Sequence, residues 1–267
     1  MSDDAVVAIT SASNPTVKEV VALRRRRHRS TTGRFVVEGA RETLRAIEAG
    51  VQIERLLVAP AVAPPDEPIV AATAHRIPVV TVSAKVFAKL SARERPDGIL
   101  SVAVAFPTDL AAIDAGDLVL VAEGIEKPGN LGAMLRTAEG VGAAVVAADG
   151  IVDPFNPNVV RASQGSLFTV PLATARTEDT IRWLGDTTVV VATPEASIDY
   201  WDVDMRGPTA VVVGSEHRGV SETWRTVGTK VRIPMVGSGD SLNASIAAAL
   251  VLYEAVRQRR VTPTPAS

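Results

Sequence analysis

The chain has 267 residues, more than the roughly 100–200 residues of an ordinary single domain, so two domains are expected. Its formal net charge is −2, and 46% of its residues are hydrophobic but only 4% aromatic, which predicts a core of Val, Ala, Leu and Ile. The absence of cysteine excludes disulfides, thiolate metal sites and a cysteine nucleophile. No run of ~18 apolar residues and no basic leader is present, so we expect a cytoplasmic protein with no membrane contact and no metal.

The first half of the chain is expected to alternate between helices and strands. A helix begins at Asn14, a capping residue followed by Pro15 in the first turn, and runs to about Arg29. Further strands are expected at 34–38, 53–59, 79–82 and 99–105, and further helices at 40–49, 69–75 and 84–91. The Pro-rich stretch 60–68 is expected to be a loop.

A second alternation follows the linker candidate at 107–116, which predicts a first domain at 1–106 and a second at 117–267. Strands are expected at 118–122, 143–148, 167–171, 188–192, 210–213 and 231–233, and helices at 131–139, 158–164, 178–184 and 242–258. Strands that alternate with helices indicate an α/β domain with a mostly parallel sheet covered on both faces.

Basic residues gather near the start of the chain. Residues 14–45 contain nine Lys or Arg against three Glu. Such a run is either a solvated helix face or a surface that binds nucleic-acid phosphates. We favour the second interpretation, for which the candidates are Arg24, Arg25, Arg26, Arg27, Arg29, Arg34 and Arg41.

Three segments of the second half carry candidate chemistry. The first, residues 123–138, leads from an apolar strand through a Gly-rich turn into a helix. In an open α/β sheet such a turn lies at the carboxyl edge of the strands, where ligands bind. Asn130 and Arg136 lie in this segment; the alternative is that Asn130 caps the helix and Arg136 is merely solvated.

The second segment, Gly214 to Val220, follows another strand, and its two glycines allow close approach of the backbone to a ligand. The third runs from Ile233 into the last helix, where Ser241 or Asn243 could act as a cap. Capping alone does not explain polar Asn243 and Ser245 in a helix that otherwise looks buried.

Together the three segments resemble the SpoU/TrmH family of RNA 2′-O-methyltransferases, part of the SPOUT class. The resemblance lies in Asn130-Leu-Gly-Ala-Met-Leu-Arg136, Gly214-Ser-Glu216-x-x-Gly219 and Ile233-Pro-Met235 followed by Ser241-Leu-Asn243-x-Ser245, in the family's order. The N-terminal segment Arg34-Phe-Val-Val-Glu38-Gly-Ala-Arg41 resembles the family's substrate-binding domain, which is similar to ribosomal protein L30e.

This resemblance implies an S-adenosylmethionine site in a C-terminal trefoil knot, although knots are rare and no periodicity predicts one. It assigns cofactor binding to Thr193, Gly214, Ile233, Met235 and Leu242. It assigns catalysis to Arg136, with Asn130, Glu216, Ser241 and Asn243 positioning it and the nucleotide. It also implies a homodimer in which one subunit completes the other's site.

The implied reaction methylates a ribose 2′-hydroxyl, which is a poor nucleophile near neutral pH. Two roles for Arg136 are compatible with the sequence. It either loses its proton in a special environment and acts as the base, or stays cationic and stabilises the oxyanion. The missing cysteine agrees with O-methylation rather than with pyrimidine C5 chemistry.

Three alternative functions are compatible with parts of this pattern. A conventional Rossmann methyltransferase is excluded, because Gly140-Val-Gly142 closes a helix instead of following the first strand. Among substrates, ribosomal RNA is favoured and transfer RNA is the alternative. A non-catalytic RNA-binding assembly factor is less favoured, because Asn130, Arg136, Glu216 and Asn243 are all present.

Overall fold

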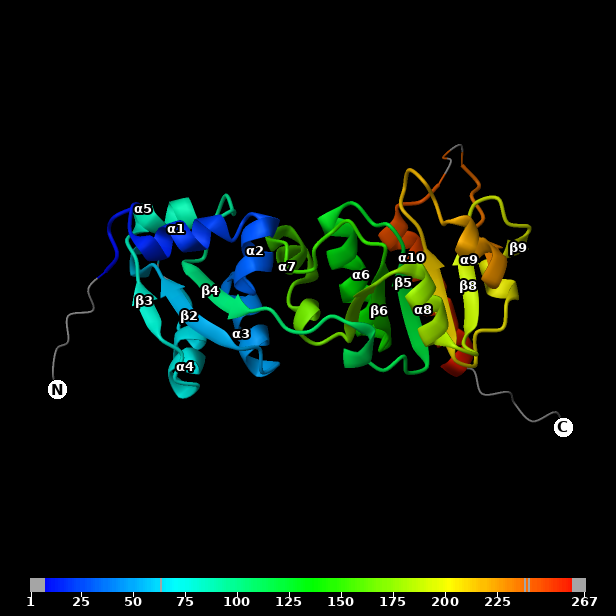
Figure 1. Ribbon diagram of the computed structural model, residues 1–267, viewed down its shortest axis with the longest axis horizontal. Coiled ribbons are helices and arrows are strands. Elements are labelled where there is room, and N and C mark those ends of the chain that lie inside the picture. The colour runs from blue at the N-terminus through cyan, green and yellow to red at the C-terminus, as the bar shows by residue number, and fades with distance from the viewer. Residues whose placement is uncertain (1–7, 63, 238, 240, 261–267) are drawn as a thin grey trace. The chain divides into compact units, whose positions relative to one another are not determined.

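The chain forms two compact units in a computed structural model, which describes residues 8–62, 64–237, 239 and 241–260. The first unit comprises the chain up to Phe106 together with Asp153–Phe168, and the second comprises Pro107–Val152 and the chain from Thr169 onward. Figure 1 shows the ribbon of both units. Each unit is described separately below.

The first unit is built on a four-stranded mixed sheet in the order β1-β4-β2-β3. Strand β4 is antiparallel to both β1 and β2, whereas β3 is parallel to β2. The strands are β1 (Arg34–Glu38), β2 (Ile53–Val58), β3 (Val79–Thr81) and β4 (Ile99–Val104). The helices are α1 (Pro15–Ala22), α2 (Arg26–Thr32), α3 (Ala40–Glu48), α4 (Glu67–Ala74), α5 (Ala84–Leu90) and α7 (Pro157–Ser163).

Alternating side chains of this sheet pack against helices on its two faces. Leu57 of β2 packs in a cluster with Val17 and Val20 of α1 and with Phe87 of α5. Its neighbour Leu56 packs in a second cluster with residues of α3 and α4. This two-residue period is the one expected of a strand that is buried on both faces. The sheet is therefore the middle layer of the first unit.

The single helix predicted from Asn14 to about Arg29 is two helices. Asn14 caps α1 as predicted, since its Oδ1 accepts the backbone N–H of Thr16 at 2.9 Å. Helix α1 ends at Ala22, and α2 begins at Arg26. Helix α2 includes residues that were expected to end the helix, and its C-cap is Gly33, which has a left-handed φ of 63°. Leu23, which follows α1 directly, is fully buried in the same cluster as Val17 and Val20.

Residues 153–168 belong to the first unit, although the sequence analysis placed them in the second domain. Phe155 packs against the buried Phe35 with ring centroids 4.8 Å apart, and the Nε of Arg29 donates to Oδ2 of Asp153 at 2.8 Å. Helix α7 forms where it was predicted, but the prediction of a strand at 167–171 is wrong. A short 3-10 helix, Ser166–Phe168, lies there, and the strand starts later at Leu172.

The second unit is a seven-stranded sheet in the order β7-β6-β5-β10-β8-β11-β9, and every neighbouring pair is parallel. The strands are β5 (Leu118–Ala122), β6 (Ala144–Ala148), β7 (Leu172–Ala175), β8 (Thr188–Ala192), β9 (Ile198–Asp199), β10 (Thr209–Val213) and β11 (Thr229–Arg232). The α/β class and the parallel sheet predicted from the sequence are confirmed.

Helices cover both faces of this sheet. The helices are α6 (Pro128–Val141), α8 (Thr177–Leu184), α9 (Glu222–Val227) and α10 (Ala244–Arg260). Helices α8 and α9 pack on one face through Leu184 and Trp224, whereas α10 packs against α6 and β10. Strands β5, β6 and β10 are buried along their whole length, as their uninterrupted apolar sequences predicted.

The predicted linker at 107–116 belongs to the second unit and lies against the edge strand of its sheet. The backbone N–H of Thr174 in β7 donates to the carbonyl of Thr108 at 2.6 Å, and a 3-10 turn forms at Leu110–Ala112. Strand β9 and helix α9 were not predicted, since both are short. Across the described ranges, no helix is long and apolar enough to cross a bilayer.

Candidate active site

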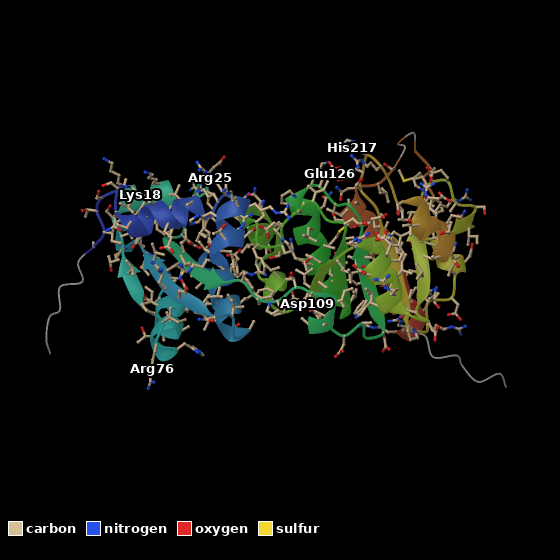
Figure 2. The ribbon with its side chains drawn as sticks, in the orientation of Figure 1. Lys18, Arg25, Arg76, Asp109, Glu126 and His217 are labelled. Atoms are coloured by element: carbon tan, nitrogen blue, oxygen red, sulfur yellow. The ribbon has the colours of Figure 1, made fainter. Side chains whose placement is uncertain are left out.

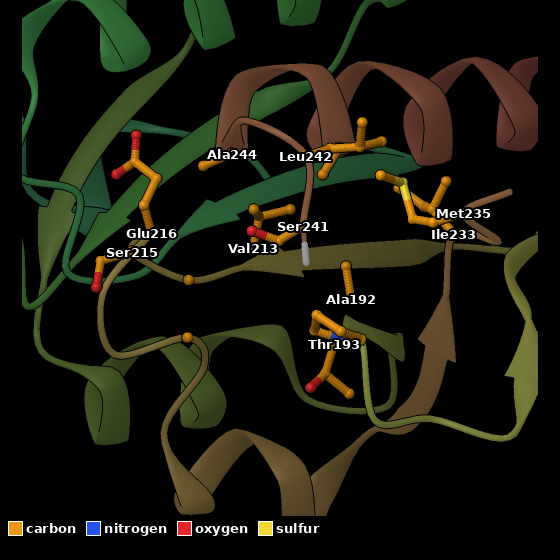
Figure 3. Close-up of a pocket in the computed structure, with 14 residues that line it drawn as sticks. Ala192, Thr193, Val213, Ser215, Glu216, Ile233, Met235, Ser241, Leu242 and Ala244 are labelled. Atoms are coloured by element: carbon orange, nitrogen blue, oxygen red, sulfur yellow. The ribbon is translucent and has the colours of Figure 1, made fainter. Parts of the chain in front are cut away.

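A pocket lies at the carboxyl edge of the parallel sheet in the second unit. It is formed by the segments that follow β8, β10 and β11, together with the start of α10. Figure 3 shows Ser215 and Glu216 at one end of the pocket, and Ile233 and Met235 at the other. The remaining lining residues are Ala192, Thr193, Pro194, Val213, Gly214, Gly219, Ser241, Leu242, Ala244 and Ala247.

The loop after β10 is tight, and glycine is required at its first position. A Cβ on Gly214 would lie 2.1 Å from the carbonyl oxygen of Gly219, far inside van der Waals contact. The loop is closed by the Gly219 N–H, which donates to the carbonyl of Ser215 at 2.9 Å, and Gly219 has a left-handed φ of 63°. The two glycines of the second motif therefore shape the wall of the pocket.

All five residues predicted to bind the cofactor line this pocket: Thr193, Gly214, Ile233, Met235 and Leu242. Val213, Ala244 and Ala247 add further apolar surface to the same wall. An apolar pocket with a few polar groups is the usual form of a small-molecule site. The structure thus brings these residues together, while their contacts with a cofactor stay a prediction.

Side chains from all three motifs meet beside the pocket in a polar cluster of Lys127, Asn130, Glu216 and Asn243. The Nδ2 of Asn130 donates to Oε1 of Glu216, and the Nδ2 of Asn243 donates to Oδ1 of Asn130 at 3.1 Å. Asn243 also caps α10, because its Oδ1 accepts the backbone N–H of Ser245 at 2.9 Å. Asn243 therefore caps α10 and also contacts Asn130, while its role in a site stays a prediction.

Lys127 is a member of the cluster that the sequence analysis missed. It directly precedes α6, and its Nζ lies 3.3 Å from Oε1 of Glu216. The available signal was a lysine next to Pro128 in the first motif, but surface lysines are too common to single one out.

The pKa of Glu216 is lowered from its ordinary value. Partial burial of the carboxyl raises the pKa, but hydrogen bonds from its own backbone N–H, from Lys127 and from Asn130, with the positive charge of Lys127, outweigh that effect. A carboxylate held in this way accepts hydrogen bonds and fixes the orientation of Asn130.

Arg136 and Ser241 lie apart from this cluster. Ser241 lines the pocket, while Arg136 is exposed on α6 and lines a groove with Ser245 and Tyr253 of α10. Among the residues that the structure describes, the guanidinium of Arg136 has no hydrogen-bond or ion-pair partner. The groove still connects to the cluster, because the hydroxyl of Ser245 donates to Oδ1 of Asn243 at 2.6 Å.

The arginines predicted to bind RNA in the first unit have different environments. Arg29 is only 4% exposed, and besides Asp153 it donates to the carbonyls of Leu23 and Arg24. The prediction that Arg29 lies on an RNA-binding surface is therefore wrong. Arg34 pairs with Glu19 and Glu54. Arg24 donates to three carbonyls at the end of α5.

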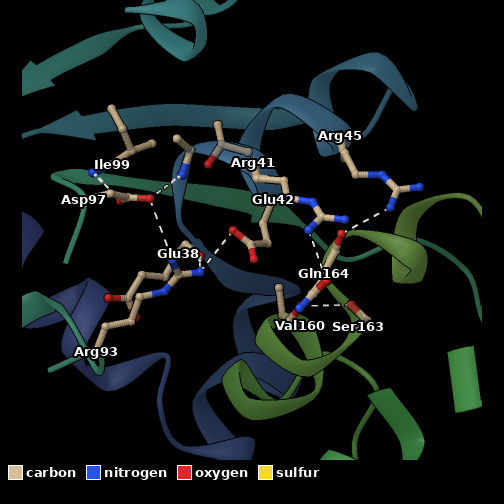
Figure 4. A network of polar contacts seen from close by, with 12 residues as sticks. Glu38, Arg41, Glu42, Arg45, Arg93, Asp97, Ile99, Val160, Ser163 and Gln164 are labelled. Carbon is tan, nitrogen blue, oxygen red and sulfur yellow. Dashed lines mark hydrogen bonds and ion pairs between the residues drawn. The ribbon is translucent and has the colours of Figure 1, made fainter. Parts of the chain in front are cut away.

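The other four predicted arginines are exposed: Arg25, Arg26, Arg27 and Arg41. Arg25 lies at the start of α2 (Figure 2). Within the described ranges, the guanidinium groups of Arg25 and Arg27 have no partner. Arg41 donates to Oε1 of Gln164 at 3.0 Å (Figure 4). All four side chains are therefore on the surface of the first unit.

The segment Glu38–Glu42, which contains Arg41, is held in place by contacts with Arg93. Figure 4 shows Arg93 between Glu38 and Asp97. Arg93 donates to the backbone carbonyl of Glu38 at 2.6 Å and pairs with the buried Glu42 at 3.0 Å. These contacts of Arg93 connect the loop before β4 to the start of α3. Nowhere in the described chain do three or more His, Cys, Asp or Glu side chains gather as a metal site would require.

Comparison with known proteins agrees with this geometry. The profile of the SpoU rRNA Methylase family matches residues 117–253, and that of the MRM3-like substrate binding domain matches residues 14–101. An uncharacterized tRNA/rRNA methyltransferase of Synechocystis sp. is 31% identical, with 97% of each chain covered. The 23S rRNA (guanosine(2553)-2′-O)-methyltransferase of Bacillus subtilis is 28% identical, covering 92% of this chain and 97% of its own.

Two solved structures are similar along nearly the whole chain. One, an RNA 2′-O ribose methyltransferase, is 41% identical with a TM-score of 0.84, covering 95% of this chain and 99% of its own. The other, an AdoMet-bound rRNA methyltransferase from Sinorhizobium meliloti, is 33% identical with a TM-score of 0.84, covering 94% and 97%. The chain therefore belongs to the SpoU rRNA methylase family. It is a methyltransferase of that family, and the sequence-based prediction of both family and enzyme class is confirmed.

Proposed function

We propose that the protein transfers the methyl group of S-adenosylmethionine to a ribose 2′-hydroxyl of ribosomal RNA. The observation that carries the proposal is the convergence of the three motifs. The second and third form one pocket, and Asn130, Glu216 and Asn243 of all three are hydrogen-bonded beside it. Relatives that are named 23S rRNA 2′-O-methyltransferases favour ribosomal over transfer RNA.

The pocket fits the proposed cofactor. Its wall at Ile233, Met235 and Leu242 is apolar, as the faces of an adenine ring require. The backbone at Gly214 has no side chain to keep a ligand away, and a Cβ there would clash with the carbonyl oxygen of Gly219. When bound, S-adenosylmethionine supplies an activated methyl group on its sulfonium.

Arg136 is the residue that we assign to the 2′-oxygen. An arginine side chain is cationic in proteins and has five N–H donors, and here no carboxylate neutralises it within the described residues. It therefore orients the ribose and stabilises negative charge on the attacking oxygen, rather than acting as the base. The hydroxyl proton leaves to water, while Asn130, Glu216 and Asn243 hold the nucleotide edge of the site.

The first unit is assigned to RNA binding. Arg25, Arg26, Arg27 and Arg41 are exposed, and phosphate contacts from such residues give affinity that falls steeply with salt. Its α/β architecture, with a four-stranded sheet between helices, supports the expected similarity to ribosomal protein L30e. A ribosomal substrate also implies that the enzyme works in the cytoplasm.

The α6–α10 groove is assigned to a second copy of the chain. Ile246, Leu250 and Tyr253 are exposed on it, although large apolar side chains usually pack when a partner is available. A second copy accounts for Arg136 in the same groove, because the Arg136 of one chain would then complete the site of the other chain. We further infer that the chain from β11 to α10 forms the trefoil knot; the order β5-β10-β8-β11, in which strands that are not consecutive in sequence are neighbours, supports it.

The test is transfer of labelled methyl from S-adenosylmethionine to purified ribosomal and transfer RNA by wild type and Arg136→Ala. Label in an alkali-resistant dinucleotide of ribosomal RNA, lost in the variant, is expected. Label only on transfer RNA would replace the substrate, and label on neither RNA nor ribosomal subunits would contradict the function.

A further inference from the structure

A buried residue, Glu123, contacts both ends of the loop that forms one wall of the pocket, one end through its backbone and the other through its carboxylate. Its backbone N–H donates to the carbonyl of Val213, the residue before the loop, at 2.9 Å. Its Oε2 accepts the backbone N–H of Ser221, the residue after the loop, at 2.8 Å. One residue at the end of β5 therefore brackets the whole segment Gly214–Val220.

The carboxylate is also the end of a short chain of hydrogen bonds. The indole N–H of Trp224 donates to the hydroxyl of Thr177 at 3.2 Å, and that hydroxyl contacts Oε1 of Glu123 at 3.4 Å. Glu123 is 7% exposed, and Thr177 and Trp224 are buried as well. The hydrogen bond from Thr177 therefore holds one oxygen of Glu123 in place, and the other oxygen accepts the N–H of Ser221.

The bracketed loop carries the groups that the proposed reaction needs. Gly214, Ser215, Glu216 and Gly219 line the pocket, and Glu216 holds Asn130. Glu123 itself does not line the pocket. A shift of either end of the loop would move the backbone at Gly214 and the carboxylate of Glu216 together.

We propose that Glu123 is a positioning residue that holds the Gly214–Val220 loop in its cofactor-binding shape. The part that concerns the cofactor rests on the proposed function of the pocket. The part that concerns the loop does not, because the bracket is a property of the fold. The two parts can therefore be measured separately.

The experiment compares Glu123→Ala, Glu123→Gln and Trp224→Phe with wild type, using the full chain. Glutamine keeps an oxygen for the N–H of Ser221, whereas alanine leaves that N–H without its acceptor. Trp224→Phe is the matched control, because it removes a buried donor of the same network but leaves the bracket in place. Melting temperatures of all variants are recorded first.

Two readouts follow. Hydrogen exchange, measured without cofactor, is expected to speed up in the peptide spanning 214–221 in Glu123→Ala, with little change in Glu123→Gln or Trp224→Phe. Affinity for S-adenosylmethionine, measured by calorimetry, is expected to fall about tenfold in Glu123→Ala and by less than about threefold in Glu123→Gln, since only alanine removes the acceptor of the part-buried hydrogen bond from Ser221. RNA affinity is expected to stay unchanged.

Unchanged exchange at 214–221 in Glu123→Ala would overturn the proposal. So would an equal loss of cofactor affinity in a Trp224→Phe variant whose melting temperature falls by the same amount, since a general loss of stability would then explain both. A separate variant, Ala247→Phe, fills the pocket. If it binds S-adenosylmethionine as wild type does, the assignment of the pocket is wrong, while the exchange result still decides the role of Glu123.

Discussion

The side-chain amide of Asn243 donates to Oδ1 of Asn130 at 3.1 Å, across 113 positions of sequence. Asn130 belongs to the first turn of α6, and Asn243 immediately precedes α10. Because Asn130 also donates to Glu216, the three motifs meet at one side chain. An amide can serve both neighbours, since it has an oxygen acceptor and two N–H donors.

This relationship predicts the effect of Asn130→Ala. The substitution removes one partner of both Glu216 and Asn243, so we expect kcat for methyl transfer to fall by about tenfold or more, the cost of one or two lost hydrogen bonds. Affinity for S-adenosylmethionine should change little, because Asn130 does not line the pocket. Asn158→Ala, an exposed asparagine of the first unit, is the control. Equal kcat values for the two variants would contradict a role for Asn130.

The lowered pKa of Glu216 predicts a dependence on pH. A carboxyl whose folded-state pKa is depressed contributes stability that is complete above its unfolded pKa of about 4.5 and is lost as pH falls through the lower folded value. Stability should therefore decline below pH about 4.5, and Glu216→Gln should remove part of this decline. Denaturant unfolding of both proteins between pH 3 and pH 7 measures it. Parallel stability curves over that range would show that Glu216 makes no contribution.

The parts of this fold that could be predicted from sequence are those with strong local signals. Strands β5 and β10 are uninterrupted apolar runs, and the Gly214–Gly219 loop needs glycine because its backbone closes on itself. The start of α1 was predicted because Asn14 caps it through a contact two residues away. In each case the decisive interaction lies within a few residues or follows from burial on both faces of a sheet.

The parts that could not be predicted depend on partners far apart in sequence. The place of residues 153–168 in the first unit rests on Asp153 meeting Arg29 and Phe155 meeting Phe35. No local pattern in the arginine run shows that Arg29 is turned inward while Arg25 and Arg27 are exposed. Lys127 likewise joins the site only because Glu216 lies opposite it.

The pair Arg29–Asp153 predicts a loss of stability rather than of RNA binding. Both side chains are largely buried, and Arg29→Ala would leave Asp153 without its cationic partner. Breaking a buried ion pair in this way costs about 3–5 kcal/mol. Arg25→Ala, four positions earlier in the sequence and exposed, should instead leave stability unchanged and weaken RNA binding. Urea unfolding and filter binding of both variants separate the two effects; a stable Arg29→Ala protein would contradict this account.

Gly214 predicts a sharp steric effect in the cofactor pocket. In Gly214→Ala the new Cβ would meet the carbonyl oxygen of Gly219 at 2.1 Å, and that oxygen belongs to the backbone that closes the loop. The loop must open to relieve this contact, so binding of S-adenosylmethionine should fall below detection in calorimetry. Gly207→Ala is the control, since nothing lies within 4 Å of a Cβ there. Retention of cofactor binding by Gly214→Ala would show that the loop takes no part in the site.

Leu250 tests the proposed pairing of two chains through the α6–α10 groove. It is partly exposed on α10 in the groove that Arg136 also lines, so Leu250→Arg would place a second positive charge in the paired surface. We expect the variant to be monomeric in sedimentation analysis, whereas wild type sediments as a dimer. Cofactor affinity should be kept if one chain forms its own pocket, while methyl transfer should fall at least tenfold because Arg136 then has no partner site. The exposed Val70 of the first unit supplies the control Val70→Arg, which should stay dimeric and active. A monomeric Leu250→Arg enzyme with full activity would show that each chain completes its own site.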